Sequence, residues 1–171
     1  MKLIKQALAS LTCILFLNST ISAQKDVVDI AIGSKDHTTL VAAVKAAGLV
    51  ETLKGKGPFT VFAPTNAAFD KLPKGTVENL LKSENKAALS GVLTYHVVSG
   101  NISSKALVEL IKKGGGKVVV KTVNGQELTA SLNGKKVEIK DANGGVATVI
   151  VADLAGSNGV VHVTDAVSLP K

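Results

Sequence analysis

Three Asn-Gly pairs, spaced nine and ten residues apart, constrain the second half of this chain more than any other feature. They are Asn124-Gly125, Asn133-Gly134 and Asn143-Gly144. Asn-Gly readily adopts the positive φ angles of a two-residue type I′ turn, so each pair predicts a reversal between antiparallel strands. Between the pairs, apolar and polar residues alternate, as expected for strands that bury one face. A fourth pair, Asn158-Gly159, predicts one more turn before the last strand.

One segment of this half breaks the alternation. Residues 146–152 are apolar almost without interruption. A continuous apolar run of this length is typical of a strand that is covered on both faces. We therefore expect residues 146–152 to form a fully buried strand.

The first half of the chain is predicted to be mainly helical. Apolar residues recur at helical spacing in short segments that start near Thr, Ser or Asn and stop near Gly or Pro. One strand, over residues 58–64, interrupts them. Helices followed by antiparallel strands give an α+β class. The expected helices are 40–47 after Thr38 or Thr39 and ended by Gly48, 68–72 after Thr65 or Asn66, 77–81 after Thr76, 86–93, and 106–113 after Ser103 or Ser104.

The N-terminal segment has the pattern of a secretory signal peptide. A positively charged start is followed by a short apolar run and by small residues that end at Ala23. We expect residues 1–23 to be removed and residues 24–171 to form one domain, found outside the cell, at its surface or in the periplasm. Cys13 suggests a lipoprotein as the alternative, but Thr12 fits the small-residue box before a modified cysteine poorly. No transmembrane segment is expected in residues 24–171.

The charge of the chain argues against one class of partner. The twenty basic residues are all lysines, and the formal net charge is +7. Nucleic-acid readers rely on arginine and on aromatic stacking, and aromatic residues make up only 3% of this chain. Scattered lysines are typical of a solvated surface, but they also permit binding to anionic polysaccharide or lipid headgroups. That alternative would use Lys54, Lys56, Lys112, Lys113, Lys135 and Lys136.

Three segments resemble one known family. They are TVFAPTNAAFDKL at 60–72, LTYHVVSG at 93–100 and NGVVHVTDAVSLP at 158–170. In this order they are similar to the leading, Tyr-His and closing motifs of the fasciclin-like domain family. The resemblance implies a fasciclin-like fold, an antiparallel β-wedge or sandwich flanked by several short helices. It also implies a secreted, non-enzymatic adhesion or extracellular-matrix module without cofactor that binds an extracellular or cell-surface protein. The sequence does not fix the oligomeric state, and we favour a monomer.

Five residues of these motifs are expected to hold the fold together: Thr65, Asn66, Phe69, His96 and His162. Buried polar groups need hydrogen-bond partners. We therefore expect His96 to be a buried, neutral imidazole that bonds to polar groups near Thr65 and Asn66.

The alternative for the second motif is a contact role. In animal members of the family the Tyr-His segment has been linked to integrin engagement, so the resemblance allows Tyr95 and His96 to form part of a partner-binding surface. On that hypothesis Tyr95→Ala weakens capture of the partner and leaves the melting temperature nearly unchanged.

Asp153 and Leu154 have two possible roles. Some animal members carry an Asp-Ile pair at this place that is implicated in integrin binding, and an exposed carboxylate is a hard oxygen ligand for a partner's metal ion. The simpler interpretation is that Asp153 ends a strand and solvates a turn. Separately, Asn101-Ile102-Ser103 fits the pattern of a glycosylation acceptor.

The sequence gives no support for an enzyme. His37, His96 and His162 are far apart and lack the spacing of metal ligands. Neither a nucleophile elbow nor a phosphate-binding loop occurs. His162 has Asp165 nearby, but a histidine and an aspartate without a placed nucleophile do not make a catalytic triad. We expect no catalytic, metal or cofactor site.

Overall fold

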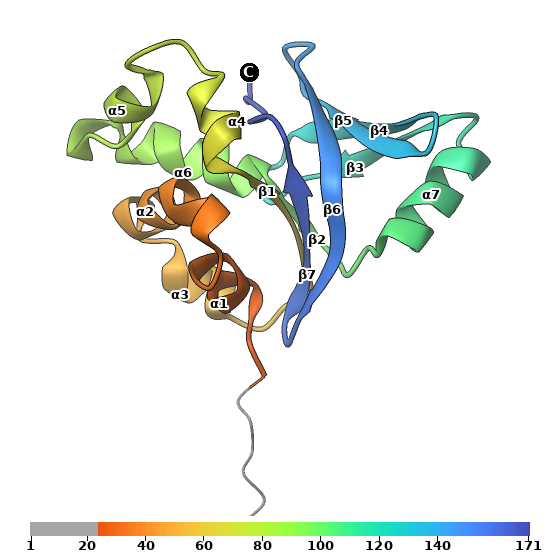
Figure 1. Cartoon of the computed structure of the whole chain (residues 1–171), viewed down its shortest axis with the longest axis horizontal. Helices are drawn as coiled ribbons and strands as arrows, with labels where there is room; N and C mark the ends of the chain where they lie inside the picture. The colour runs from red at the N-terminus through yellow and green to blue at the C-terminus, as the bar shows by residue number, and fades with distance from the viewer. Residues whose placement is uncertain (1–23) are drawn as a thin grey trace, which may run out of the picture.

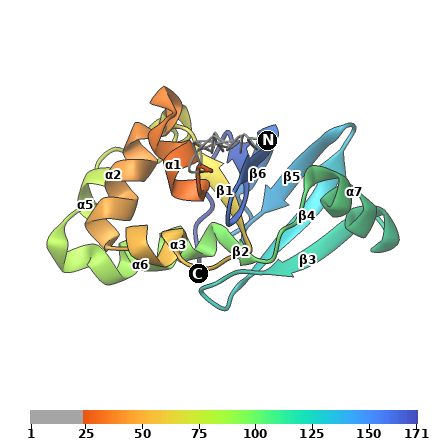
Figure 2. The ribbon, with the colours of Figure 1, turned by 90° about the horizontal axis from the view of Figure 1, so that it is seen from below.

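The computed structural model describes residues 24–171 as a helical half and a strand half that meet along a central group of strands (Figure 1). Helices α1 to α6 lie on one side, and strands β3 to β5 with helix α7 lie on the other (Figure 2). The signal peptide predicted for residues 1–23 lies outside the described residues. The α-helices are α1 (Val27–Ile32), α2 (Thr38–Ala47), α3 (Val50–Lys54), α4 (Asn66–Asp70), α5 (Thr76–Leu80), α6 (Lys86–Tyr95) and α7 (Ser104–Lys113), and the strands are β1 (Phe59–Pro64), β2 (Val97–Ser99), β3 (Lys117–Lys121), β4 (Glu127–Asn133), β5 (Lys136–Lys140), β6 (Val146–Gly156) and β7 (Gly159–Thr164).

Several helix ends follow from local sequence as predicted. The Thr65 hydroxyl caps α4, and the Ser103 hydroxyl caps α7, each by accepting a backbone N–H of the first helical turn at 3.3 Å. Gly48 ends α2 with a φ of 72°, a left-handed conformation that costs glycine little. Local chemistry therefore fixes these boundaries.

The start of α2 differs from the prediction. Neither Thr38 nor Thr39 is the capping residue, because α2 already includes both. Instead Asn66, from α4, reaches across: its side-chain oxygen accepts the Thr39 N–H at 3.0 Å. Gly75 rather than Thr76 precedes α5, with a φ of 85°. The first of these caps comes from another element, so a local sequence pattern does not reveal it.

The seven strands form one continuous order, β2-β1-β7-β6-β5-β4-β3. Five of the six neighbouring pairs are antiparallel, and the pair β1–β7 is parallel. The prediction of an antiparallel wedge therefore holds for every neighbouring pair except β1–β7, which is parallel. A parallel pair requires a long crossover connection, and here the chain between β1 and β7 supplies it. The α+β class is confirmed.

The Asn-Gly pairs mark reversals, but their geometry is not type I′. In the turn between β4 and β5, Asn133 pairs with Lys136, so Gly134 and Lys135 are the central residues. Only Gly134 has a positive φ, of 61°. A glycine at the first central position with positive φ is the pattern of a type II′ turn, whereas type I′ needs positive φ at both positions.

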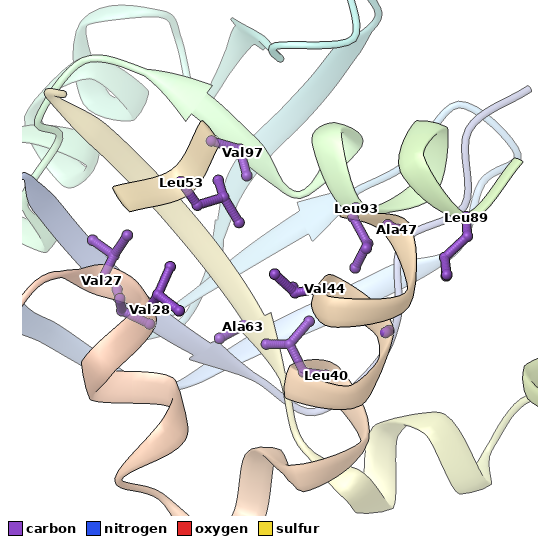
Figure 3. Packing of buried hydrophobic residues seen from close by; sticks show 12 residues of the cluster. Val27, Val28, Leu40, Val44, Ala47, Leu53, Ala63, Leu89, Leu93 and Val97 are labelled. Carbon is purple, nitrogen blue, oxygen red and sulfur yellow. The ribbon is translucent and has the colours of Figure 1, made fainter. Parts of the chain in front are cut away.

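Two hydrophobic clusters fill the molecule, one on each side of β1. The first lies between the helices and β1, β2 and β7, and Figure 3 shows Leu40, Val44 and Leu93 pointing into it. The second lies between α7 and strands β3 to β5, where Ile111 and Leu128 are fully buried. Burying one such aliphatic side chain contributes about 1.5–3 kcal/mol, so both clusters stabilise the fold substantially.

Strand β6 is less buried than its sequence predicts. Val146, Ile150 and Val151 have exposed fractions of 48%, 50% and 47%. Ala147 is buried on the face opposite to that of Val146 and Ile150. A register shift between Val149 and Val151 breaks the alternation, so that Val151 is exposed beside Ile150 and β6 presents one face to solvent. The prediction that residues 146–152 are covered on both faces is wrong.

Within residues 24–171, no helix has both the length and the apolar character that a membrane span requires.

Candidate functional site

The three motif segments come together around β1. This strand lies between β2, which belongs to the second motif, and β7, which belongs to the third. The Phe62 N–H donates to the His96 carbonyl at 2.8 Å, and the Thr65 N–H donates to the Thr164 carbonyl at 3.2 Å. Phe69 packs against the same hydrophobic cluster as Val161. The sequence motifs thus form one connected region of the fold.

Tyr95 lies in the interior, with an exposed fraction of 0%. Its hydroxyl donates to the Glu127 carbonyl at 2.9 Å and accepts the Ala142 N–H at 3.0 Å. Burial raises the pKa of this phenol. A side chain without exposed surface does not touch a partner, so the hypothesis of Tyr95 as a contact residue is corrected: it joins α6 to the strand half.

His96 is buried and neutral, as expected, but its partners differ from the prediction. Its Nδ1–H donates to the Val92 carbonyl at 2.8 Å, and its Nε2 accepts the Ser168 N–H at 3.0 Å. One nitrogen donates and the other accepts, which is the arrangement of a neutral imidazole. Burial lowers the pKa of His96. His96 therefore connects α6 to the segment after β7 rather than to Thr65 and Asn66, and it is not on a contact surface.

Asn66 of the leading motif ties three segments together. Its side-chain oxygen accepts the Thr38 hydroxyl at 3.2 Å and the Thr39 N–H at 3.0 Å, and its amide donates to the Lys35 carbonyl at 3.0 Å. Together with the capping hydroxyl of Thr65, these bonds orient α4 against the start of α2. The role is positional.

His162 occupies the strand-half side of β7 and is 1% exposed. Its Nε2–H donates to the Ile102 carbonyl at 2.9 Å, and its Nδ1 accepts the Asp153 N–H at 3.3 Å. The ring stacks on Phe62 with 5.7 Å between ring centroids. Asp165, considered above as its partner, instead accepts the Thr148 N–H at 2.8 Å.

Asp153 has an unusual backbone. It is the one non-glycine residue among 24–171 with a positive φ, of 61°, and it lies where the pairing of β6 with β7 shifts register. Its exposed carboxylate accepts the Ser104 N–H at 2.7 Å and also the Ser104 hydroxyl. These bonds lower the pKa of Asp153. The carboxylate therefore holds the first residue of α7 against β6.

Leu154 points the other way from Asp153. It is partly buried and packs against the first hydrophobic cluster, whereas Asp153 is exposed. The two residues are therefore not presented together to a partner. Asp153 is also not at the end of a strand, as the simpler interpretation had it, because β6 continues to Gly156.

Asn158 and Asp141 organise the region in ways that the sequence analysis missed. Asn158 lies in the turn between β6 and β7; its side-chain oxygen accepts the Val27 N–H at 3.1 Å, and its amide donates to the carbonyls of Leu53 and Gly55 at 2.7 and 3.0 Å. Asp141 accepts the Gly145 N–H at 2.7 Å and, with its other oxygen, the Leu169 N–H at 2.9 Å. Both residues follow a strand and lie in a turn that contains glycine. This position is the feature of the sequence that could have pointed to their structural role.

The connected region formed by the three motif segments is shared with a known protein family. The fasciclin domain family model matches residues 35–170, which include all three motif segments. The chain belongs to the fasciclin domain family.

Relatives of this fasciclin domain occur in bacteria and animals. Protein sll1483 of Synechocystis is 49% identical over 144 residues, which cover 84% of this chain and 73% of that protein. The transforming growth factor-beta-induced protein ig-h3 of Sus scrofa is 37% identical over 84% of this chain and 19% of that protein. A solved FAS1 domain pair from the insect cell adhesion molecule fasciclin I has the same fold, with a TM-score of 0.62 and 22% identity, over 76% of this chain and 43% of that one.

Ser104, Asp153 and His162 lie close together in this fasciclin domain, but their bonds do not suit catalysis. The Ser104 hydroxyl is bonded to a carboxylate, and both nitrogens of His162 are bonded to backbone groups. His162 therefore has no free nitrogen to take the proton of this hydroxyl, whose acceptor is the Asp153 carboxylate. Over residues 24–171, no group of three His, Cys, Asp or Glu side chains is arranged to hold a metal ion.

The hollows of the fasciclin domain do not resemble a small-ligand site. Two apolar cavities beside the helices have volumes of about 30 and 20 Å³, room for about one water molecule each. Hollows of about 500, 470 and 250 Å³ lie open on the surface. Drug-sized ligands are usually bound in clefts that bury most of their surface.

The lysines of the polyanion alternative come from several elements. Lys54 is held by Asp26 and Asp29 at 2.9 and 2.6 Å, so its charge is already paired. Lys112 and Lys113 end α7, whereas Lys135 and Lys136 belong to the turn and strand at β5. These four side chains are exposed on separate elements.

Proposed function

We propose that this fasciclin domain is a secreted, non-enzymatic adhesion or matrix module that binds an extracellular or cell-surface protein through the outer face of β6. The observation that carries the proposal is the exposure of Val146, Ile150 and Val151, three large aliphatic side chains on one strand. Apolar side chains gathered on a surface mark interaction sites, and the buried centre of a protein interface is apolar. The fasciclin I domain pair belongs to a cell adhesion molecule, which supports the same class of function.

Asp153 supplies a polar group on the same strand, with its carboxylate directed toward Ser104 of α7. Its carboxylate is exposed and already accepts two bonds from Ser104, and a carboxylate has room for further donors. We place it at the rim of the proposed contact surface, where it would accept a hydrogen bond from the partner or complete a partner's metal site.

The test is capture of the partner by the purified protein from an extracellular fraction. Ile150→Thr combined with Val151→Thr removes apolar area at the centre of the face, and we expect at least a tenfold loss of affinity, because covering half of two aliphatic side chains contributes about 1.4 kcal/mol or more. The matched control is Ile32→Thr, which changes an equally exposed isoleucine, at 49%, on the helical half and is expected to leave capture unchanged.

Salt separates this proposal from the polyanion alternative. An apolar interface retains its partner between 50 mM and 500 mM salt, whereas attraction of lysines to polysaccharide or lipid headgroups is screened at the higher concentration. Capture that disappears in high salt, and that is indifferent to the double substitution, would favour the alternative through Lys112, Lys113, Lys135 and Lys136.

A further inference from the structure

The four Asn-Gly pairs of residues 24–171 differ in how the fold holds them. An asparagine followed by glycine is the pair most prone to spontaneous deamidation, because glycine has no Cβ to shield its backbone nitrogen from the asparagine side chain. In this reaction the glycine nitrogen attacks the side-chain carbonyl carbon, Cγ, of the asparagine. The reaction therefore needs an asparagine amide that is able to turn and a glycine N–H that is free.

Asn124 lacks both of these freedoms. Its side-chain oxygen accepts the Thr122 hydroxyl at 2.6 Å and the Gln126 N–H at 2.9 Å. Its amide donates to the Gly91 carbonyl at 3.3 Å. The N–H of the following Gly125 donates to the Thr122 carbonyl at 3.0 Å. Both groups that would have to react are engaged.

Asn143 and Asn158 are also held by main-chain groups. The Asn143 amide donates to two backbone carbonyls of the segment after β7, each at 3.0 Å. The Gly144 N–H donates to the Asp141 carbonyl at 3.1 Å. Asn158 makes the three bonds described above, and the Gly159 that follows it is buried. In both pairs the asparagine must break two or more bonds before it can react.

Asn133 differs from the other three asparagines. Together with Gly134 it is exposed, at the turn between β4 and β5. Its amide donates to the Glu138 carboxylate at 2.7 Å, a bond between two side chains at the surface. Such a bond restrains the amide little, because water competes for both groups. Within the described chain the Gly134 N–H donates to no backbone carbonyl, so the attacking nitrogen is free.

We propose that Asn133 is a modification site, at which the side-chain amide is lost by deamidation. The Gly134 nitrogen bonds to Cγ of Asn133 and gives up its proton, the Cγ–Nδ2 bond breaks, and Nδ2 leaves as ammonia with that proton. The product is a five-membered succinimide. Water then adds to one of its two carbonyls, and the ring opens either to aspartate or to isoaspartate, in which the main chain runs through the former side chain.

The modification changes the turn in charge and in length. A new carboxylate faces Glu138 where an amide had donated a hydrogen bond, and like charges on neighbouring strands are destabilising. Isoaspartate also adds one carbon to the main chain at Asn133, whose pairing with Lys136 defines the two-residue turn. A contact between β4 and β5 is thereby replaced by a repulsion. The inference depends on the Asn-Gly turns alone and not on the function proposed above.

The test compares the four pairs within one protein. The folded protein is incubated under mildly alkaline conditions in water labelled with ¹⁸O, so that each carboxylate formed from a succinimide carries the label. Cleavage after glutamate separates Asn124 from Asn133, because Glu127 lies between them, and electron-transfer fragmentation locates the label and identifies isoaspartate. We expect Asn133 to convert at least about tenfold faster than each of the other three, which must first break two or more hydrogen bonds.

Unfolding and substitution supply the controls. In protein unfolded by urea we expect the four pairs to react at comparable rates, since glycine follows each asparagine and no tertiary contact holds it. Asn133→Gln would have to close a six-membered ring, and we expect it to lack the acidic form that ion exchange separates from the parent protein. The matched control Asn143→Gln changes another exposed Asn-Gly pair and is expected to retain the acidic form.

Three results would overturn the inference. One is conversion of Asn124, Asn143 or Asn158 as fast as that of Asn133 in the folded protein. Another is the same excess of Asn133 in the unfolded protein, since the fold would then not select the site. The last is an acidic form that persists in Asn133→Gln.

Discussion

Tyr95 connects the two halves of the molecule through a single oxygen atom. Its hydroxyl is bonded both to the Glu127 carbonyl and to the Ala142 N–H, which belong to the strand half, while its backbone ends α6. Tyr95→Phe leaves these two buried groups without their partner. We expect a loss of about 1–3 kcal/mol in the free energy of unfolding, measured by urea denaturation, with the fold retained.

Tyr95→Ala goes further, because it also opens a cavity. Truncating a buried aromatic side chain costs about 3–5 kcal/mol. This outcome replaces the expectation from sequence that the variant keeps its melting temperature. A Tyr95→Ala protein with unchanged stability would show that the burial of Tyr95 does not stabilise the fold.

The buried histidines predict how stability depends on pH. Burial lowers the pKa of both His37 and His96 in the folded protein, whereas the unfolded chain has the ordinary histidine pKa of about 6.5. The unfolded state therefore takes up protons first as the pH falls. Stability should be fully present above about pH 7 and should decrease as the pH falls below about 6.5.

The measurement is the urea midpoint at pH 7.5 and at pH 5.5. We expect a lower midpoint at pH 5.5, while the NMR signals of the His96 ring in the folded protein still report the neutral form. Asp153 affects stability in a different pH range. Its pKa is lowered in the folded protein, so its contribution to stability is present above about pH 3.8 and is lost only at lower pH. A midpoint that rises between pH 7.5 and pH 5.5 would contradict the assignment of neutral, buried histidines.

At the scale of elements, the irregularity of β6 holds the start of α7, which Ser103 caps locally, against the sheet. The register shift at Asp153 turns its carboxylate toward the Ser104 N–H, the first N–H of α7, and the side chain acts as a cap from another element. Asp153→Ala removes the acceptor and places a less tolerant residue at a positive φ. We expect a loss of about 1 kcal/mol or more by urea denaturation.

Asp153→Asn separates the structural role of this residue from a contact role. Asparagine tolerates the left-handed conformation and retains an oxygen for the Ser104 N–H, so we expect stability to stay within about 0.5 kcal/mol of the parent protein. If Asp153 is at the rim of the contact surface, the same variant weakens capture of the partner. Unchanged capture would restrict Asp153 to the start of α7.

Local chemistry explains which elements the sequence predicts. The strand at 58–64, the cap at Thr65, the stop at Gly48 and the reversals at Asn-Gly all depend on neighbouring residues, and the structure contains each of them. The partners of His96 and Asn66 come from segments far along the chain, and no local pattern encodes them.

The candidate site was predictable only in part, for the same reason. The motif residues do form one region. The sequence around Tyr95 and His96, however, is compatible both with side chains that face a partner and with side chains that face the interior. The exposure of Ile150 and Val151 depends on register shifts between β6 and β7, and a run of apolar residues gives no sign of them.

At the scale of the whole molecule, the two hydrophobic clusters are expected to unfold together. Tyr95 belongs to the second cluster yet ends α6, whose Leu89 and Leu93 belong to the first. The chain has one tyrosine and no tryptophan, so tyrosine fluorescence reports on this junction alone. We expect its unfolding transition to coincide with that of far-UV circular dichroism, as for a two-state domain.

Substitutions on each side make this test specific. Leu93→Ala in the first cluster and Leu128→Ala in the second should each cost about 2–5 kcal/mol and should shift both transitions equally. Separate transitions, with only Leu128→Ala moving the fluorescence, would show two units that unfold independently.

The parallel pairing of β1 with β7 has a consequence for biogenesis. Phe59 pairs with Gly159 and Pro64 with Thr164, so β1 emerges from the ribosome a hundred residues before its neighbour. Contacts between such distant parts of a chain form slowly, because a large loop must close first. During synthesis one edge of β1 remains open until residues 159–164 are available, so the centre of the sheet is completed only when its last strand has been made.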